Sequence, residues 1–347
     1  MRVALVTART VHHADPSAAA DRLDTLRALL AGRGHDVTVF CGQWWEGEHD
    51  AFDHDGVTYR AVGLTPADRW APLRLVPALR AFDPDVVHVA ASRPGFVFAA
   101  RAATPLGAPV VTEYYDPPPA GALHRWAANA SDAVVVPSEF VATAAQEVGF
   151  PSESLRQFPN AVEMERVRAV EADPDAGDVV YSGTLDEEAN LESLLLALAE
   201  FRSYDWSATV VGDGPERAGY ERQARDMGIA DRIDFVGEQD LESRLALFKG
   251  AHVYAQTAYR SSFPTDLLRA LACGCVGVVE YHANSAAHEL VAGCSRGFLA
   301  TSDEELVDCL RDATDVDHED VDERFATYDE TAFLERYLEL YRELGAV

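Results

Sequence analysis

The stretch "YRSSFPTDLLRALACGCVGVVEY", residues 259–281, carries the pattern from which the fold is worked out. It predicts a loop, a helix that begins near Pro264, a break at Gly274 and Cys275, and a buried apolar strand. A helix that leads into an apolar strand is the repeating unit of a parallel sheet covered on both faces. The start of this helix is also a candidate anion site, because a helix N-terminus presents free N–H groups and the positive end of its dipole.

The same alternation of helix and strand recurs along the chain. The apolar runs expected as strands are residues 2–8, 36–40, 56–62 (a hairpin arm), 85–91, 109–114, 133–137, 179–183, 207–214, 232–237, 251–257 and 276–281. Val-rich runs separated by helices predict parallel strands, so the expected fold class is α/β with two doubly wound, Rossmann-like domains in tandem.

A Pro-, Gly- and acid-rich segment, residues 156–178, interrupts this alternation and predicts an interdomain linker. We expect a first domain over residues 1–163 and a second over 164–329, followed by an amphipathic helix at 330–345. Ligands of doubly wound sheets bind beyond the carboxyl ends of the strands, so we expect a site in the cleft between the domains.

The charge composition is strongly acidic. The chain has 58 Asp and Glu against 29 Lys and Arg, and Lys249 is its one lysine. Such a surface repels itself unless salt screens it, which favours a protein of a halophilic archaeon. The alternative is an acidic surface that binds cations or basic partners. Nucleic-acid binding is disfavoured, because phosphate backbones require clustered Lys and Arg.

Compartment is inferred from cysteine usage and hydropathy. The odd number of cysteines, five, favours reduced thiols over a disulfide framework. No apolar run has the length of a membrane-spanning helix, and "MRVALVTA" lacks the layout of a signal peptide. We therefore expect a soluble cytoplasmic protein.

About nine segments in order resemble the retaining glycosyltransferases of family 4, which have the GT-B architecture. Among them are "FDPDVVHVAA", "ASDAVVVPSEF", "FPNAVE", "YSGTLDEEANLESLLLAL", "ATVVGDGPE" and "SFPTDLLRALACGCVGVV". The resemblance implies transfer of a hexose from a nucleotide sugar to a sugar or lipid-linked acceptor, with no bound metal. It also implies that the second domain binds the donor and that the helix at 330–345 packs back on the first, acceptor-side domain.

The sequence departs from this family in the donor pocket. Ser261 and Arg269 stand where the family has two glutamates, and Thr184 and Ala189 stand where its diphosphate-binding Arg and Lys are found. The glycine-rich loop after the first strand is replaced by "RTVHHADPSAAAD", residues 9–21. We interpret the pocket as a rebuilt donor site in which Arg269 supplies a phosphate cation. The alternative is a donor-incompetent scaffold that acts as a non-catalytic partner in glycan assembly.

The candidate donor-binding residues lie at expected strand ends and at the start of the helix near Pro264. Glycines after a strand allow close ligand approach but also form plain turns. Ser261 or Ser262 is alternatively an N-cap, and Arg269 alternatively pairs with Asp266 on its own helix. The candidates are Gly183, Thr184, Gly212, Gly214, Ser261, Ser262, Phe263, Thr265, Asp266 and Arg269.

The candidate acceptor residues belong to the first domain. Asp116 is the candidate catalytic carboxylate, and Tyr115 beside it should border the cleft, as should Glu113. Arg69, Trp70 and Arg74 are typical of a helix at the inner face of a membrane, or else of a helix packed on the sheet with its arginines reaching solvent.

Overall fold

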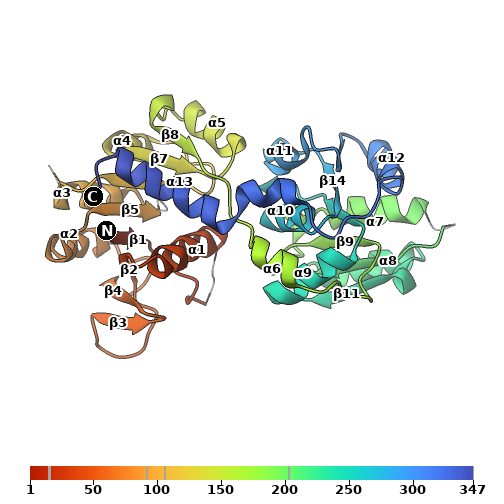
Figure 1. Ribbon diagram of the computed structural model, residues 1–347, viewed down its shortest axis with the longest axis horizontal. Helices are drawn as coiled ribbons and strands as arrows, with labels where there is room; N and C mark the ends of the chain where they lie inside the picture. The colour runs from red at the N-terminus through yellow and green to blue at the C-terminus, as the bar shows by residue number, and fades with distance from the viewer. Residues whose placement is uncertain (15–16, 91–92, 105–106, 202–203, 347) are drawn as a thin grey trace. The chain divides into compact units, whose positions relative to one another are not determined.

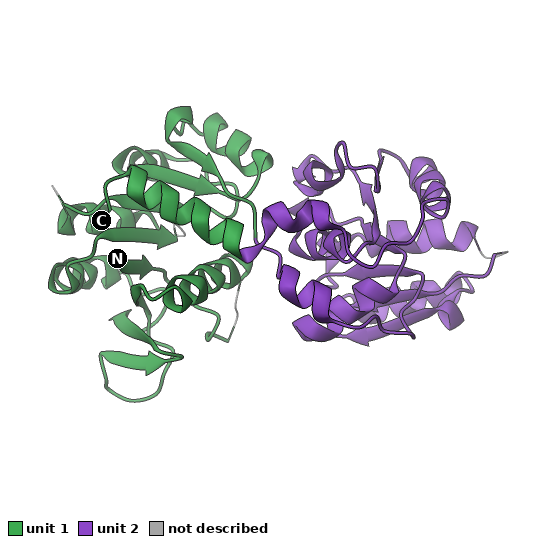
Figure 2. Ribbon diagram, in the orientation of Figure 1, with its two compact units in different colours: residues 1–160, 331–347 green, residues 161–330 purple. Residues whose placement is uncertain are grey.

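The structure is a computed structural model that describes residues 1–14, 17–90, 93–104, 107–201 and 204–346. Parts of the first loop, of the strand expected at 85–91 and of two expected helices lie outside the described residues. The chain forms two compact units, Met1–Asn160 with Thr331–Val347, and Ala161–Glu330 (Figure 2). Each unit is built on one mainly parallel sheet, which confirms the α/β fold class with two doubly wound domains.

Unit 1 contains an eight-stranded sheet in the order β3-β4-β2-β1-β5-β6-β7-β8, and only β3 is antiparallel to its neighbour (Figure 1). Its strands are β1 (Arg2–Val6), β2 (Asp36–Gly42), β3 (Ala51–His54), β4 (Val57–Gly63), β5 (Val86–Ala90), β6 (Val110–Glu113), β7 (Ala133–Val136) and β8 (Leu155–Gln157). Its helices are α1 (Ala18–Gly32), α2 (Ala71–Phe82), α3 (Pro94–Ala103), α4 (Ala122–Ala130), α5 (Glu139–Glu147), the 3-10 turn η1 (Ser152–Ser154) and α13 (Glu330–Glu343), which belongs to unit 1 from Thr331 on.

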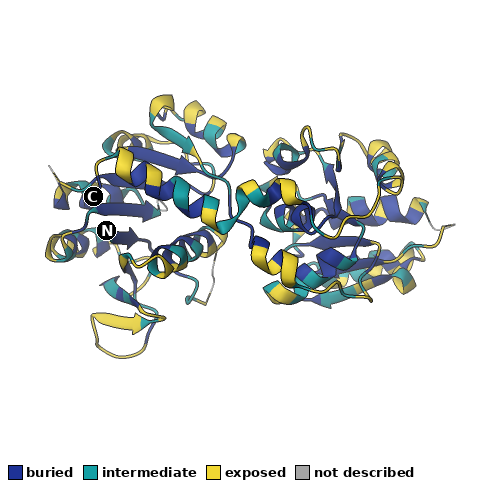
Figure 3. Cartoon of the chain, viewed as in Figure 1, coloured by how far each residue is buried: buried dark blue, intermediate teal, exposed yellow. Residues whose placement is uncertain are grey.

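Alternate side chains of the strands face two helical layers. Ala4 and Val6 of β1 pack in one core cluster with α2, α3 and α4, whereas Leu5 between them faces α1. The central strands are buried on both faces, as their Val-rich sequences require (Figure 3). The hairpin of β3 and β4 confirms the expectation at 56–62, and the exposed β3 was missed because it is polar and short.

Unit 2 contains a six-stranded parallel sheet in the order β11-β10-β9-β12-β14-β16, and a two-stranded parallel pair of β13 and β15. Its strands are β9 (Val179–Ser182), β10 (Ala208–Val211), β11 (Ile233–Gly237), β12 (Val253–Gln256), β13 (Arg260–Ser261), β14 (Val276–Glu280), β15 (Asn284–Ser285) and β16 (Gly297–Ala300). Its helices are α6 (Met164–Ala169), α7 (Leu191–Glu200), α8 (Arg217–Asp226), α9 (Leu241–Gly250), α10 (Thr265–Ala272), α11 (Ala287–Val291) and α12 (Asp303–Ala313), with the 3-10 turns η2 (Glu187–Ala189), η3 (Ala230–Arg232) and η4 (Glu323–Tyr328).

The order of the strands in unit 2 reverses between β9 and β12, since β10 and β11 lie on one side and β14 and β16 on the other. Ligands of doubly wound sheets bind beyond the carboxyl ends of the strands at such a switch point. Within the expected linker, α6 forms a short helix, and Lys249 caps it by donating to the carbonyl oxygens of Val167 and Val170 at 3.1 and 2.9 Å. The one lysine of the chain therefore has a structural role.

Helix α13 is held on unit 1 by buried polar contacts. The Tyr337 hydroxyl accepts a hydrogen bond from Arg22 of α1 at 2.7 Å, and Tyr341 lies 2.9 Å from the His88 ring on β5. None of the described helices combines the length and apolar character needed to cross a bilayer.

Candidate functional site

A cavity of about 490 Å³ lies at the carboxyl edge of the unit 1 sheet. It is lined by the loops after β1, β4, β5 and β6 and by the first turns of α1 and α4. Asp116 and Tyr115 line it, as expected of the segment after β6, and so do Arg9, Arg93 and His124. Asp116 is exposed, whereas Tyr115 is buried and its hydroxyl accepts a hydrogen bond from Asn160 at 3.3 Å. The cavity thus offers charged groups of both signs.

The Glu113 side chain, which also borders this cavity, already interacts with other side chains of the protein. Its carboxylate pairs with Arg22, lies 2.8 Å from the His88 ring and accepts the Tyr337 hydroxyl at 3.0 Å. Burial opposes its ionisation, but Arg22 and His88 outweigh burial and lower the pKa of Glu113 to about 2. The Glu113 carboxylate is therefore committed to internal contacts, because its oxygens already hold three partners.

The depressed pKa of Glu113 predicts an acid-sensitive unit 1. Its ordinary pKa is 4.5, and a folded-state value of about 2 corresponds to about 3 kcal/mol of stability. That contribution is fully present above the unfolded pKa and is lost as the pH falls toward 2. We expect the urea midpoint of unit 1 to fall between pH 5 and pH 3 in the wild type. A Glu113→Gln variant should show a weaker dependence over the same interval, and an equal dependence would contradict this account.

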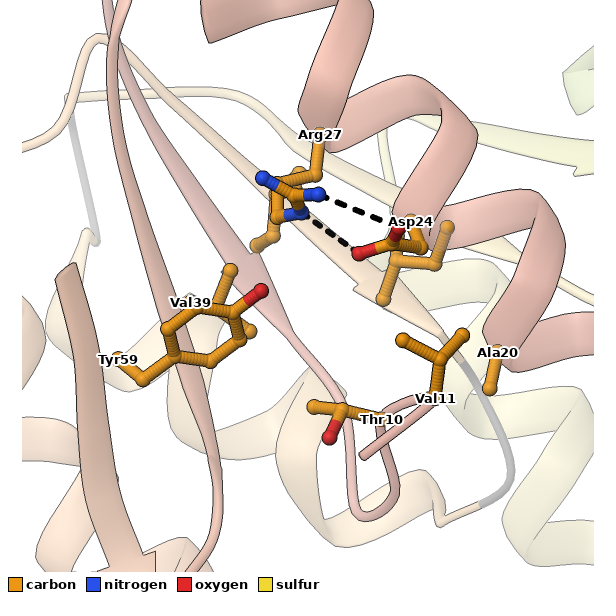
Figure 4. Close-up of a pocket in the computed structure, with 9 residues that line it drawn as sticks. Thr10, Val11, Ala20, Asp24, Arg27, Val39 and Tyr59 are labelled. Carbon is orange, nitrogen blue, oxygen red and sulfur yellow. Dashed lines mark hydrogen bonds and ion pairs between the residues drawn. The ribbon is translucent and has the colours of Figure 1, made fainter. Parts of the chain in front are cut away.

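A second hollow in unit 1 is too small for a sugar. It measures about 10 Å³ and lies between α1, β1, β2 and β4 (Figure 4). Arg27 and Asp24 pair across its rim at 2.6 and 3.2 Å. A volume of this size holds at most one water, so this hollow is a packing defect and not a ligand site.

The described part of the loop at 9–21 packs on the β3–β4 hairpin. The His12 ring lies 4.2 Å from the Trp44 ring and 4.8 Å from the His54 ring, and its Nε2 is 3.4 Å from the Tyr59 hydroxyl. Burial and the neighbouring His54 lower the pKa of His12. His12 therefore holds this loop by its ring contacts. Asp15 and Pro16 lie outside the described residues.

In unit 2 the glycines at the strand ends serve close packing of loops. A Cβ on Gly212, whose φ is +120°, would lie 2.0 Å from the Gly183 carbonyl oxygen. A Cβ on Gly214 would lie 2.3 Å from the Leu185 carbonyl oxygen. Thr184 between these contacts is exposed. The loops after β9 and β10 thus meet at the carboxyl edge of the sheet, and their glycines have a structural reason independent of any ligand.

The N-cap residue of α10 is not one of those expected from the sequence. The N-cap position is Pro264, not Ser261 or Ser262, and it makes no side-chain cap hydrogen bond. Ser261 lies in β13, and its carbonyl oxygen accepts the Ala286 N–H at 2.8 Å. Phe263 is buried, and its carbonyl oxygen accepts the Thr265 N–H at 3.1 Å.

Arg269 lies in a partly buried cluster of charges. Its Nε and Nη2 donate to the two Glu163 oxygens at 3.0 and 2.7 Å, and its Nη1 donates to Asp266 at 3.1 Å. Asp266 also accepts bonds from Arg244 and from the Ser182 hydroxyl. Burial opposes the ionised form of Asp266, but the two arginines outweigh it and lower its pKa. The prediction that Arg269 is available for a donor phosphate is wrong, because two carboxylates already occupy its guanidinium.

Removing the Arg269 guanidinium is expected to destabilise unit 2. Arg269→Ala leaves Glu163 without its bidentate partner, and we expect a loss of about 2 kcal/mol in the free energy of unfolding. Arg311→Ala is the matched control, because Arg311 also pairs with a carboxylate three residues away on its own helix but is exposed. Equal urea midpoints for the two variants would refute the structural role assigned to Arg269.

The three residues expected at a membrane surface lie at the N-terminal end of α2. Arg69 precedes the helix and lies over the Trp70 ring at 5.3 Å, and Arg74 pairs with Asp68 at 2.8 Å. All three expected side chains are exposed, and Trp70 occupies the N-cap position.

Three residues that sequence reasoning missed organise these sites. Arg22 lies four and eight residues before Leu26 and Leu30, on the same buried side of α1. This spacing puts Arg22 on the apolar face of the helix and could have revealed its burial. Glu163 and Arg244 had no such pattern, because their partners on α10 are distant in sequence.

Two protein families match successive parts of this sequence. Residues 20–166 match the family described as Glycosyltransferase Family 4, and residues 164–328 match the family described as Glycosyl transferases group 1. The first match falls largely on unit 1 and the second on unit 2.

Individual relatives are distant. The 2-deoxystreptamine glucosyltransferase of Streptomyces kanamyceticus is 29% identical over 131 residues, and the match spans 33% of this chain and 34% of that protein. Sucrose-phosphate synthase from Thermosynechococcus elongatus has a TM-score of 0.75 and 17% identity, with 99% of this chain and 98% of that chain covered. Anabaena Alr3699/HepE in complex with UDP-glucose has a TM-score of 0.73 and 17% identity, with 99% and 100% covered. At such identities these two structures establish the shared fold.

Proposed function

We propose that this chain, which belongs to the glycosyltransferases of family 4 and group 1, transfers a hexose from a nucleotide sugar to a sugar or lipid-linked glycan acceptor. The match of residues 164–328 to the group 1 family carries the proposal, because in GT-B enzymes that half binds the donor. The solved complex of Alr3699/HepE with UDP-glucose and the name of the S. kanamyceticus relative support a nucleotide-linked hexose as donor.

The donor is proposed to bind at the carboxyl edge of unit 2 through the backbone. The candidates that remain are Gly183 and Thr184 after β9, Gly212 and Gly214 after β10, and the segment 261–265 that leads into α10. Backbone N–H groups bind phosphate whatever the side chains are, which suits a pocket with Thr184 and Ala189 at the two cation positions of the family. The reaction itself needs no metal in this proposal.

The acceptor is proposed to bind in the cavity of unit 1. Asp116 is exposed at the rim of that cavity and would accept a hydrogen bond from an acceptor hydroxyl, with Tyr115 beside it. Arg9 and Arg93 line the same cavity and suit an acceptor that carries a phosphate. The exposed Arg69, Trp70 and Arg74 are proposed to contact a membrane that presents a lipid-linked acceptor.

One observation favours a second candidate function, a donor-incompetent scaffold in glycan assembly. Arg269 is neutralised by Glu163 and Asp266, so the cations missing at positions 184 and 189 are not replaced from α10. A diphosphate would then rely on backbone groups, each of which contributes less than a charge-assisted hydrogen bond.

A glycosyl-transfer assay distinguishes the enzyme from the donor-incompetent scaffold. The chain is incubated with UDP- and GDP-hexoses and a panel of sugar and polyprenyl-phosphate acceptors, and free nucleotide and glycosylated product are measured. The enzyme proposal predicts product with the anomeric configuration of the donor. Asp116→Asn should lower kcat, whereas Glu139→Gln, an exposed carboxylate on α5, should not. Folded protein that yields neither nucleotide nor product supports the scaffold.

The acidity of the chain predicts stability that depends on salt. A formal net charge of −29 produces self-repulsion, which ions screen. We expect the thermal midpoint to rise continuously from low to molar KCl, and the same midpoint at both extremes would remove the case for a halophilic protein.

A further inference from the structure

One face of unit 1 differs in charge from the rest of the chain. It is the outer face of α2, α3 and α4, of which α3 contacts the other two, and all three share one core cluster beneath. The helices and the loops that lead into them, residues 64–82, 93–103 and 114–130, contain six arginines and two aspartates. The whole chain has 29 basic and 58 acidic residues, so this face, called here the α2–α4 face, reverses the overall balance.

Much of this positive charge faces solvent. Arg69, Arg80 and Arg125 are exposed. Of the two aspartates, Asp68 has a largely buried side chain paired with Arg74, and Asp116 is exposed. Arg101 is discounted because it pairs with Asp132, which lies just outside these segments. The next helix, α5, begins and ends with a glutamate, so the basic surface ends at α4.

The same face concentrates exposed apolar side chains. Among the described residues twelve large hydrophobic side chains are exposed, and six of them lie here. The six are Leu64, Trp70, Leu73, Phe98, Leu123 and Trp126. Leu123 and Trp126 are one helical turn apart on α4 and are 59% and 57% exposed, so that helix presents an apolar stripe to solvent. Exposed apolar side chains grouped in this way mark an interaction surface.

We propose that the α2–α4 face docks on the surface of an anionic lipid bilayer. Tryptophan and leucine side chains insert at the boundary of headgroups and acyl chains, and arginines bind the phosphates of the headgroups. Charge complementarity favours this partner, since an anionic surface would repel the other, acidic faces of the chain and orient the protein on this one. The loops into α2, α3 and α4 follow β4, β5 and β6 at the edge where the acceptor cavity lies. The α2–α4 face would then be where the protein meets a lipid-linked acceptor. This acceptor role rests on the proposed function, whereas docking on the bilayer does not.

Vesicle binding tests the face without any enzymatic readout. The full chain is sedimented with vesicles of phosphatidylcholine containing phosphatidylglycerol, and with pure phosphatidylcholine, at low and at molar KCl. We expect binding to the anionic vesicles, weaker binding at molar salt, and a partition coefficient lower by about fivefold for each of Arg69→Gln and Arg125→Gln. The pair Leu73→Ser with Leu123→Ser should lower it by about tenfold.

Matched leucines on unit 2 provide the control. Leu196→Ser with Leu299→Ser changes two side chains that are also exposed and should leave the partition coefficient unchanged. Equal loss in both pairs, or no binding to anionic vesicles by folded protein, overturns the proposal. Self-association that disappears in the Leu73 and Leu123 variant, with no vesicle binding, would assign the face to a second copy of the chain and also overturn it. Failure of donor binding would leave the vesicle result intact.

Discussion

Replacing Arg22 by alanine is expected to lower the free energy of unfolding of unit 1 by about 3–5 kcal/mol. The Arg22 side chain is 2% exposed, and its guanidinium contacts Glu113, Asn160, the Phe158 carbonyl oxygen and the Tyr337 hydroxyl. Without it the Glu113 carboxylate remains buried beside His88 with no cation fixed against it. Because Tyr337 belongs to α13, the variant should also loosen the last helix, which limited proteolysis detects as early cleavage after residue 330.

The matched control for this prediction joins the same two elements at the surface. Arg33, which caps α1, pairs with Glu335 of α13, and both side chains are about half exposed. Arg33→Ala should cost less than about 1 kcal/mol, because exposed ion pairs contribute little. If the two variants unfold at the same urea concentration, the buried network does not hold α13.

Gly212→Ala is expected to destabilise unit 2 by about 3–5 kcal/mol, since it combines backbone strain with a clash. The φ of Gly212 is +120°, where only glycine is comfortable, and a Cβ would lie 2.0 Å from the Gly183 carbonyl oxygen. The loop after β10 would have to move away from the loop after β9, and the proposed backbone site for the donor would be lost with it.

A second glycine allows the cost of backbone strain to be measured without a steric clash. Gly228 also has a positive φ, +72°, but nothing lies within 4 Å of the position of its Cβ. Gly228→Ala should cost only about 1–2 kcal/mol, the cost of the left-handed conformation. Equal losses for the two variants, measured by urea denaturation, would mean that the approach of the two loops contributes nothing.

The fold was predictable because its pattern is carried by strands that are buried in the middle of each sheet. The strands β5, β7 and β14 are Val-rich and apolar on both faces. Their continuous apolar runs and the turn residues at the ends of these runs therefore predicted their positions. β8 and β16 were not predicted, because both are edge strands with partly exposed residues. Such strands are defined by hydrogen bonds to a neighbour, and these leave little mark on the local sequence.

The candidate site was predictable in position and not in contacts. The segment after β6 does border a cavity, as the topology requires, and Asp116 lies on its rim. The partners of Glu113 and Arg269 could not be foreseen, because Arg22 and Glu163 are distant from them in sequence and decide which charges remain available. A charged residue seen alone in a sequence is a candidate ligand group, and only its tertiary partner shows whether it is already paired.

Binding of a nucleotide sugar tests the central claim most directly. The thermal midpoint is measured in molar KCl with UDP- and GDP-hexoses, with the free nucleotides, and with the hexoses alone as controls. The account predicts that one nucleotide series raises the midpoint, by an amount that grows with ligand concentration and reaches about 2.7 kcal/mol of stabilisation at a hundred times Kd. An unchanged midpoint with every nucleotide and nucleotide sugar, in protein that melts cooperatively, would contradict it.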